Sequence, residues 1–420
     1  MRILLACELY HPSVGGVQEV VRQVAERLVL RGHQVTVATS RLPERRTRTL
    51  NGVDIVEFDV AGNSVRGLSG DVDGYRGHVL AGNYDVFMVK AAQQWTFDAL
   101  VPVLDLMPGP KIFVPCGFSA LREPAYADYY REMPALLAKF DHLIFYASDY
   151  RDVNMAREHH LRQFSIVPNG ASGREFGVPR DPGFRRRAGI DEGAFVILTV
   201  GTLTGGMKGH RELARAFELA AFGDQPSVLM LNGNVYEVPP TPMRRTLLKA
   251  LRRFARRVLR RRRAASAGAE SLEAIVARIN KGASGKRALI VDLNREDLVQ
   301  AYMNSDIFAF ASNIEYSPLV LYEAAAAGLP FLTVPVGNAA EIAEWTGGGL
   351  VCPAPQDDRG YTRVDPVVLA DHLGRLAADG PLRQALGQAG HSAWLERFTW
   401  ETITKQYEAI FKDVVERTQA

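Results

Sequence analysis

A regular alternation of short apolar segments with helical segments constrains the fold of this chain more than any other feature. Residues 2–6 form the first apolar segment; a loop containing Pro and Gly, an amphipathic stretch and a second apolar run at 35–39 follow it. Gly32 is placed to end the helix, because glycine readily adopts the left-handed conformation found just beyond a helix terminus. Strands separated by helices predict a parallel, doubly wound α/β sheet.

The same alternation occurs twice along the chain. Further strand candidates are residues 53–58, 86–89, 112–114, 143–146 and 165–167 in the first series, and 196–200, 228–231, 288–291, 307–311 and 331–334 in the second. A turn at residues 168–170 and a polar stretch that reaches Pro182 separate the two series. A chain of 420 residues is also too long for one ordinary core. We therefore predict two similar α/β units that join near residue 175.

Composition argues against several classes of protein. Cys7, Cys116 and Cys352 form no CxxC pair and have no neighbouring His pattern, which disfavours a disulfide framework and a zinc site. The first apolar segment lacks the features of a secretory signal. No apolar stretch approaches the ~20 residues that cross a bilayer. These observations predict a cytoplasmic protein whose contact with a membrane would be peripheral.

Residues 244–263 carry a dense positive charge, with eleven Lys or Arg and no acid. The net charge is +3, so the rest of the chain is at 3 − 11 = −8, and a general nucleic-acid-binding surface is not expected. Apolar residues recur in the segment at three- and four-residue spacing. This pattern predicts an amphipathic helix that docks peripherally on an anionic membrane, at the inner face of the cell membrane. Packing on its own domain and contact with an acidic partner are the alternatives.

The strongest motif directly follows the strand candidate at 307–311. Ser317 is suited to cap a helix and Pro318 to begin it, so a helix N-terminus faces the carboxyl edge of the sheet. Its free N–H groups form a ready diphosphate site. Glu315 and Glu323 flank that site, and a carboxylate there is favourable only if it accepts hydrogen bonds from sugar or ribose hydroxyls. The alternative is a surface glutamate beside a capped core helix.

This motif resembles the retaining glycosyltransferases of family 4, in which two glutamates separated by seven residues precede an Ala-rich, Gly-Pro helix end. The resemblance implies the GT-B architecture, an α/β fold with two Rossmann-like domains facing across a cleft. It implies that Glu315 contacts the hydroxyls of the donor sugar and that Glu323 binds the ribose. The main chain near Ser317, Leu319 and Val320 would hold the diphosphate.

The resemblance covers nearly the whole chain. Residues 10–16 look like the family's Pro-x-x-Gly-Gly loop, in which Gly15 and Gly16 let the backbone approach the donor phosphate or the acceptor. Residues 167–170 match its interdomain turn, and 398–401 match its closing helix. The implied domains are residues 1–175 for the acceptor, 176–395 for the nucleotide sugar with a basic insertion at 244–263, and a C-terminal helix, 396–420, that returns toward the first domain.

Two loops match the family's pattern only in part. Lys208 and Gly209 match its diphosphate clamp, but Thr202 stands where an Arg is usual, which removes one cation from the leaving group. Arg211 is a candidate substitute for that Arg.

The other departure is Cys116, which stands where many relatives have a His that contacts the donor sugar. A thiol does not replace an imidazole in proton transfer at neutral pH. Cys116 lines the donor pocket or is simply packed, and His11, beside the glycine loop, is a candidate stand-in.

The pair Asp71 and Asp73 has the form of a metal-binding DxD motif, but it lies in an early Gly-rich loop far from the donor motifs. We interpret it as a solvated turn and expect no metal. The first loop lacks GxGxxG spacing, and residues 35–40 offer no acid at the strand end, which argues against a nicotinamide site. We expect no cofactor other than the nucleotide diphosphate sugar that serves as donor.

We therefore predict a hexosyl-type glycosyltransferase of cell-envelope or exopolysaccharide biosynthesis, with Lys208 and Glu315 as catalytic residues. It would move a sugar from a nucleotide diphosphate sugar to a glycan or lipid-linked acceptor, and the resemblance implies retention. One alternative is a non-catalytic scaffold that binds nucleotide sugar, which Thr202 and Cys116 motivate. A nucleotide-sugar epimerase is the other, because fold does not determine function.

Overall fold

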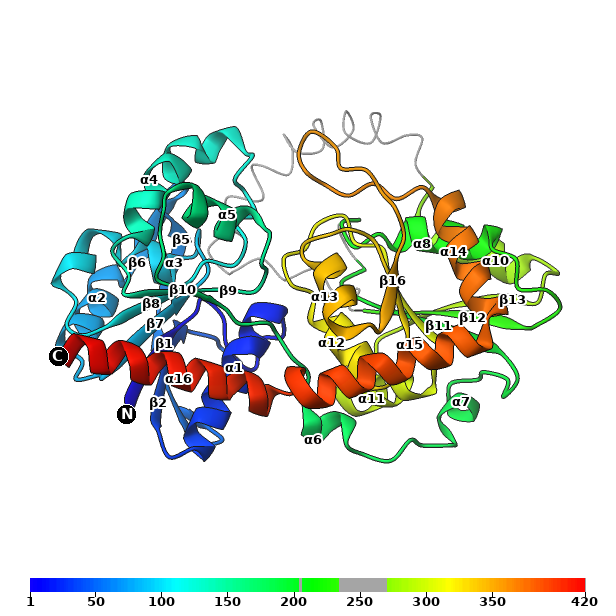
Figure 1. The fold of residues 1–420 in the computed structure, drawn as a ribbon, viewed down its shortest axis with the longest axis horizontal. Coiled ribbons are helices and arrows are strands. Elements are labelled where there is room, and N and C mark those ends of the chain that lie inside the picture. Colours follow the sequence, from blue (N-terminus) through cyan, green and yellow to red (C-terminus); the bar gives the residue numbers. More distant parts are fainter. Residues whose placement is uncertain (204–205, 234–269, 420) are drawn as a thin grey trace.

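The computed structural model describes residues 1–203, 206–233 and 270–419. Two α/β units lie side by side along the long axis of the molecule, and the last helix runs from the second unit back across the first (Figure 1). We call residues 1–167 the first unit and the described residues between 173 and 393 the second unit.

The first unit is built on a sheet that holds eight of the described strands, in the order β10-β9-β8-β7-β1-β2-β4-β3. Neighbouring strands are parallel except for β3 and β4. The elements are β1 (Arg2–Ala6), α1 (Gly16–Leu30), β2 (Gln34–Ser40), β3 (Thr49–Leu50), β4 (Val53–Phe58), the hairpin β5 (Val60–Asn63) and β6 (Gly67–Gly70), α2 (Val72–Ala81), β7 (Val86–Lys90), α3 (Trp95–Asp98), β8 (Lys111–Val114), α4 (Ala127–Leu137), β9 (His142–Phe145), α5 (Arg151–Glu158) and β10 (Phe164–Ile166).

The second unit is built on a parallel sheet in the order β13-β12-β11-β14-β15-β16. Its described elements are α6 (Gly173–Phe176), α7 (Phe184–Arg187), β11 (Phe195–Val200), α8 (His210–Leu219), β12 (Ser227–Asn232), α10 (Leu272–Lys281), β13 (Lys286–Val291), α11 (Arg295–Asn304), β14 (Ile307–Phe310), α12 (Leu319–Ala326), β15 (Phe331–Thr333), α13 (Ala339–Thr346), β16 (Gly349–Val351), α14 (Pro366–Ala378) and α15 (Gly380–Ala393). A π-helical turn, η3 (Trp394–Phe398), leads into α16 (Trp400–Gln419).

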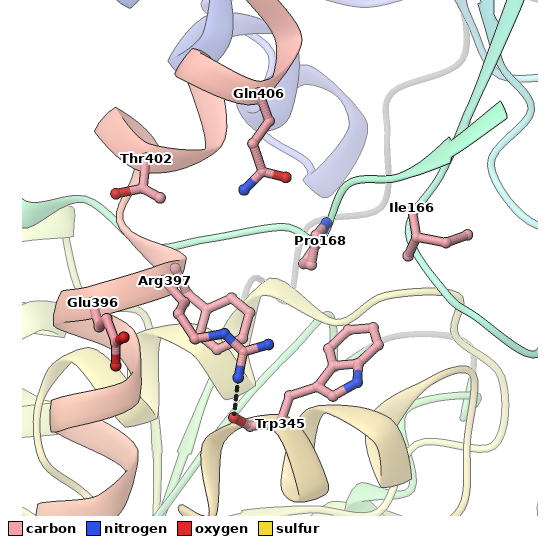
Figure 2. A pocket seen from close by; sticks show the side chains of 8 residues that line it. Ile166, Pro168, Trp345, Glu396, Arg397, Thr402 and Gln406 are labelled. Atoms are coloured by element: carbon pink, nitrogen blue, oxygen red, sulfur yellow. Dashed lines mark hydrogen bonds between the residues drawn. The ribbon is translucent and has the colours of Figure 1, made fainter. Parts of the chain in front are cut away.

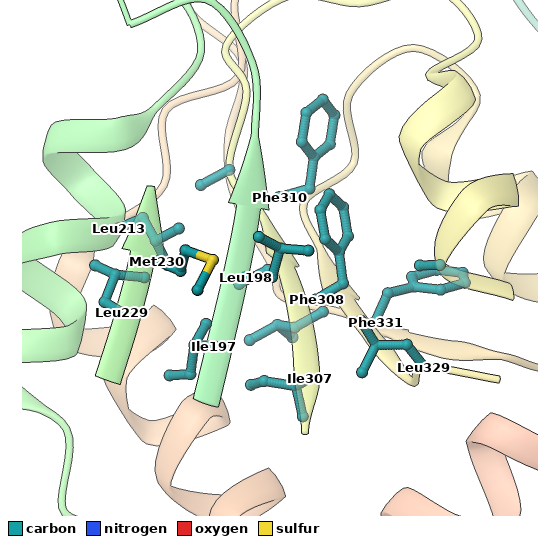
Figure 3. Packing of buried hydrophobic residues seen from close by; sticks show 14 of the residues in the cluster. Ile197, Leu198, Leu213, Leu229, Met230, Ile307, Phe308, Phe310, Leu329 and Phe331 are labelled. Atoms are coloured by element: carbon teal, nitrogen blue, oxygen red, sulfur yellow. The ribbon is translucent and has the colours of Figure 1, made fainter. Parts of the chain in front are cut away.

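Apolar runs form the central strands because a parallel strand covered by helices is buried on both faces. In the second unit, Ile197 and Leu198 of β11 pack between neighbouring strands that supply Met230 and Phe308 (Figure 3). Burial of these side chains anchors the strands, and the loops at their carboxyl ends start from a rigid base.

The helix α16 closes the molecule by packing on α1, as Figure 1 shows. On α16, Glu408 pairs with Arg31 and lies 3.0 Å from the Nε2 atom of His33, both just beyond α1, and 2.8 Å from Lys412 of its own helix. Burial raises the pKa of the Glu408 carboxyl, but the hydrogen bonds from Lys412, His33 and Arg31 outweigh burial and lower the pKa to about 2. The C-terminal helix is thereby attached to the first unit.

Three local predictions concern Gly32, the start of α12, and the pair Asp71 and Asp73. Gly32 follows the C-terminus of α1 with φ of 88°, as predicted. The expected start of α12 at Pro318 is wrong by one residue: Pro318 has an extended ψ of 115°, the helix begins at Leu319, and Ser317 makes no capping hydrogen bond. The pair Asp71 and Asp73 is part of a helix start rather than a turn, since Asp71 caps α2 by accepting a hydrogen bond from the Gly74 N–H at 3.1 Å.

The predicted amphipathic segment, 244–263, lies outside the described residues. Within the described part of the chain, every helix is too short or too polar to cross a membrane.

Candidate functional site

The topology of each sheet selects one edge for a ligand. In the second sheet, β11 lies between β12 and β14, so the connections that leave β11 and β14 run to opposite faces. In the first sheet, β1 and β7 have the same relation. Loops that diverge at such a switch point leave a crevice at the carboxyl ends of the strands, where doubly wound proteins bind their ligands. The predicted site residues follow β11, β14, β1 and, for Cys116, β8, and therefore lie at the carboxyl edges of the two sheets.

The loops after β11 and β14 meet tightly at the second edge. Gly209 has φ of 66°, and a Cβ atom there would lie 1.7 Å from the carbonyl oxygen of Ala311, so only glycine allows this approach. The loops are also joined by a hydrogen bond of 2.9 Å from the Asn313 N–H to the Met207 carbonyl oxygen.

This approach brings together Lys208 and Glu315, the two predicted catalytic residues. The Lys208 ammonium donates a hydrogen bond to Oε1 of Glu315, and the Ser312 hydroxyl donates to the same oxygen at 3.2 Å. The side chains of Lys208 and Glu315 are 32% and 17% exposed, so both remain open to a ligand from the cleft. A bound phosphate would compete with Glu315 for the lysine.

The N-terminus of α12 points to the same edge and also touches the first unit. Leu319 begins the helix, and a Cβ atom on Gly16, the first residue of α1, would lie 4.0 Å from its Cδ1 atom. The first residues of α1 and α12 are therefore neighbours in space, and Gly15 and Val320 lie one position from them in the sequence. The Ser317 carbonyl oxygen accepts a hydrogen bond from Asn169 Nδ2 at 3.1 Å.

Glu323, the predicted ribose ligand, is held by two side chains that sequence reasoning missed. Its Oε1 atom lies 2.7 Å from Arg295, and its Oε2 atom accepts a hydrogen bond from the Tyr302 hydroxyl at 3.1 Å. Arg295 also pairs with Glu175 of α6 at 2.9 Å. The arginine therefore connects α6 with α12 within the second unit. No local pattern around Arg295 signals this role, because its partners are far away in sequence.

The remaining predicted residues of the second edge occupy different environments. Thr202 is exposed, whereas the guanidinium of Arg211 reaches back to the loop, 3.2 Å from the position of a Cβ atom on Gly206. Arg211 is thus placed near the loop from which the usual arginine is missing. His210, the residue before Arg211, is buried, and burial lowers its pKa to about 4, so the imidazole is neutral at pH 7.

The first edge carries a half-buried thiol, a buried lysine and an exposed histidine. Cys116 lies just beyond β8 with φ of 62°, and burial raises the pKa of its thiol to about 11, so it is protonated at neutral pH. Lys90, the last residue of β7, is 1% exposed and its ammonium has no hydrogen-bond partner, although it lies 4.9 Å from the ring centre of Tyr146. Burial lowers the Lys90 pKa to about 8. His11 is exposed on the loop after β1, and its carbonyl oxygen accepts a hydrogen bond from Arg45.

A separate cavity of about 420 Å³ lies where the chain crosses between the units (Figure 2). Pro168 of the connecting segment, Trp345 of α13 and Gln406 of α16 line it. Arg397 also lines the cavity and donates a hydrogen bond to the Trp345 carbonyl oxygen at 3.3 Å (Figure 2). Since it contains none of the predicted donor residues, we do not assign it to the donor site. Elsewhere in the described ranges, His, Cys, Asp and Glu form no group of three or more that could hold a metal ion.

Comparison with known proteins gives this geometry a family context. Residues 245–392 match the sequence model of the family described as Glycosyl transferases group 1. This stretch contains Glu315 and Glu323 but not Lys208. Within this stretch the chain is therefore similar to the group 1 glycosyltransferases. A curated relative, N-acetyl-alpha-D-glucosaminyl L-malate synthase of Bacillus anthracis, is 28% identical over 121 residues, a stretch that spans 29% of each chain.

Solved structures resemble this chain over nearly its full length. Sucrose-phosphate synthase from Thermosynechococcus elongatus superposes with a TM-score of 0.74 at 18% identity and 99% coverage of both chains. Anabaena HepE in complex with UDP-glucose superposes with a TM-score of 0.67 at 15% identity, over 98% of this chain and 100% of that one. At such identities the likeness speaks for the fold alone. The predicted GT-B architecture is confirmed.

Proposed function

We propose that this protein is a glycosyltransferase that takes a sugar from a nucleoside diphosphate sugar and attaches it to a glycan or lipid-linked acceptor. The observation that carries the proposal is the meeting of Lys208, Glu315 and the N-terminus of α12 at the switch point of the second sheet. A cation and free helix N–H groups suit a diphosphate, and a carboxylate beside them suits sugar hydroxyls.

In the proposed reaction, the bond between the anomeric carbon and the diphosphate oxygen breaks while the acceptor oxygen bonds to that carbon. Lys208 exchanges Glu315 for the departing diphosphate, whose growing charge it stabilises together with the amides near Leu319 and Val320. Glu315, once released, orients the sugar through its hydroxyls. The leaving phosphate oxygen receives the proton of the acceptor hydroxyl. We propose retention of configuration from the family resemblance.

Arg211 and Lys208 supply positive charge at this edge from side chains, and the helix supplies it from backbone amides. We therefore propose that donor binding needs no divalent metal. Because HepE was crystallised with UDP-glucose, UDP and UDP-glucose are the first probes. Thermal shift against UDP, GDP, ADP and CDP in the presence of a chelator tests this: a ligand at 100 times its dissociation constant stabilises by ~2.7 kcal/mol. A strict requirement for Mg²⁺ or Mn²⁺ would contradict the metal-free site.

A second candidate function is a scaffold that binds nucleotide sugar without turning it over. The protonated Cys116 and the exposed Thr202, in place of a histidine and an arginine, favour it. Product analysis with the donor selected by thermal shift, with and without an acceptor extract, separates the candidates. A glycosyltransferase forms a glycosylated product only with acceptor, an epimerase changes the sugar without acceptor, and a scaffold leaves the donor intact.

We also propose that residues 244–263 bring the protein to the inner face of an anionic membrane, where a lipid-linked acceptor of envelope or exopolysaccharide synthesis would be presented. The eleven basic residues in this segment support the proposal, since each Lys or Arg near an anionic surface contributes ~1 kcal/mol. Sedimentation with anionic and neutral vesicles, with and without residues 244–263, tests it. Equal binding by the deletion variant would rule the segment out.

A further inference from the structure

Tyr316 directly follows Glu315 in the second unit, but its side chain packs in the first unit. The Tyr316 hydroxyl oxygen accepts a hydrogen bond of 2.9 Å from the Tyr146 N–H, at the end of β9. Its ring centre lies 5.4 Å from that of Tyr146 and 5.0 Å from that of Tyr150. The tyrosine therefore reaches from the second unit to two aromatic side chains of the first unit.

The first unit is shaped to receive this ring. Gly117 has φ of 83°, and a Cβ atom there would lie 2.6 Å from Cγ of Tyr316 and 2.9 Å from Cε1 of Tyr150. Asp152, which is fully buried, fixes the glycine by accepting a hydrogen bond from its N–H at 2.8 Å. The receiving loop is the one that contains Cys116, on the side where we place the acceptor.

Further hydrogen bonds hold the residues on either side of Tyr316. The Tyr150 hydroxyl donates to the Glu315 carbonyl oxygen at 2.8 Å, and Asn169 donates to the Ser317 carbonyl oxygen at 3.1 Å. Three consecutive residues of the donor loop, 315–317, thus each accept a hydrogen bond from outside the second unit. The backbone of Glu315 is held from the first unit, while its carboxylate is held by Lys208 and Ser312 from the second.

We propose that Tyr316 is a positioning residue that makes the orientation of Glu315 depend on contact between the two units. When the two units are in contact, the Tyr316 ring packs beside Gly117, and the Glu315 carbonyl oxygen accepts the hydrogen bond from Tyr150. When they separate, these contacts are lost and the carboxylate is no longer fixed against the donor sugar. The inference rests on the proposed function of Glu315 and adds that donor chemistry is coupled to the acceptor-side loop.

Two substitutions and a matched control test the proposal. Tyr316→Phe removes the hydroxyl, with its hydrogen bonds to the Tyr146 N–H and to Asp152, but keeps the ring, and Tyr316→Ala removes both hydroxyl and ring. Tyr75→Phe is the control, because the buried Tyr75 hydroxyl donates to the Thr96 carbonyl oxygen at 2.8 Å entirely within the first unit. The measurements are kcat with the donor selected above and UDP-glucose as first probe, the dissociation constant of UDP by calorimetry, and the radius of gyration of the ligand-free protein by small-angle X-ray scattering.

We expect kcat to fall about 10-fold in Tyr316→Phe and further in Tyr316→Ala, as the loss of the hydroxyl and then of the packing implies. UDP affinity should stay within about twofold, because UDP contacts would come from the second unit. Tyr316→Ala should enlarge the radius of gyration of the free protein, and Tyr75→Phe should change neither kcat nor the radius.

Parental kcat in both Tyr316 variants would overturn the proposal. So would an equal fall of kcat in Tyr75→Phe, which would indicate general destabilisation, or a loss of UDP affinity in Tyr316→Phe that matches the loss of kcat. If the parent protein turns over no donor, the proposed function fails, and scattering decides the contact separately. An unchanged radius of gyration in Tyr316→Ala would then overturn the coupling of the units through Tyr316.

Discussion

The carboxyl edges of the two sheets share a topology but treat charge differently. At the second edge, the side chain of Lys208 is 32% exposed and is paired with Glu315. At the first edge, Lys90 is 1% exposed, and its ammonium has no hydrogen-bond partner. A charge that is paired and accessible to solvent lowers the free energy of unfolding little, and a ligand can replace its partner. An unpaired buried charge lowers the free energy of unfolding more.

The backbone differs between the edges as well. In the first unit, the non-glycine residues Ala91, Gln93, Cys116 and Phe118, in the loops after β7 and β8, have positive φ values. In the second unit the positive φ near the site is carried by glycines such as Gly209. Non-glycine residues in that region store strain, which concentrates at functional sites. The second edge thus presents a charge pair whose partners a ligand can replace, whereas the first edge is distinguished by its strained backbone.

The largest effect should come from breaking the charge pair of the donor edge. Glu315→Gln removes the charged partner of Lys208. It also weakens the proposed contacts to sugar hydroxyls, and two charge-assisted hydrogen bonds to these hydroxyls amount to about 3–6 kcal/mol. We expect transfer to fall about 100-fold or more with the fold intact, measured as kcat/KM and by circular dichroism. Glu273→Gln, at an exposed position of α10, is the control and should retain parental activity. A fully active Glu315→Gln protein would contradict the role of the pair.

Replacement of Lys90 at the first edge should increase the free energy of unfolding of the protein. The folded-state pKa of Lys90 is about 8 against an ordinary value of 10.5, which corresponds to a cost of about 3 kcal/mol whenever the lysine is charged in both states. Lys90→Met should therefore raise the free energy of unfolding by about 1–3 kcal/mol at pH 7, since the cation–π contact with Tyr146 offsets part of the cost.

The pH dependence checks the cause. Because the folded pKa is depressed, the parent binds fewer protons when folded between pH 8 and 10.5, and its stability rises across that window. The advantage of Lys90→Met should be complete below pH 8 and vanish above pH 10.5 in urea titrations. Lys208→Met, which removes a paired and partly exposed lysine, should not stabilise the protein. A gain in both variants would mean that the two edges do not differ in this respect.

A smaller effect is expected at the ribose side of the donor edge. Glu323→Ala should weaken UDP binding by about 2 kcal/mol, because a charged acceptor of ribose hydroxyl hydrogen bonds is lost. Calorimetry with UDP and with an analogue that lacks the ribose hydroxyls measures it, and the variant should no longer distinguish the two. Glu175→Ala removes the other partner of Arg295 and should keep that distinction. Parental UDP affinity in Glu323→Ala would show that the ribose role is wrong.

The smallest effect is expected from restoring a cation to the donor loop. Thr202 is exposed, so Thr202→Arg can be accommodated, and activity should be unchanged or rise by up to about 10-fold. Thr202→Gln, of similar length but neutral, separates charge from bulk in the same kinetic assay. A sharp loss of activity in a folded Thr202→Arg protein would mean that the loop is arranged differently from the family's clamp.

Sequence patterns predicted the central strands to within about two residues, because a buried parallel strand leaves a local run of apolar residues. Four short strands, β3, β5, β6 and β16, were not predicted. Of these, β16 has only three residues and follows two glycines, which gives no such run. The one-residue error at α12 has a tertiary origin. Asn169 of the connecting segment binds the Ser317 carbonyl oxygen, and the chain stays extended through Pro318 before the helix starts.

The sequence by itself determined that the chain forms two doubly wound units and that glycine-containing loops and a helix start follow particular strands, since these depend on residues close together in the chain. The tertiary structure alone decided which side chains meet: Lys208 with Glu315, 107 positions away; Glu323 with Arg295; and Tyr316 with Tyr146 across the cleft. It also decided that Lys90 is left without a partner. Charge pairing and burial depend on distances in space, which a local pattern of polar and apolar residues does not encode.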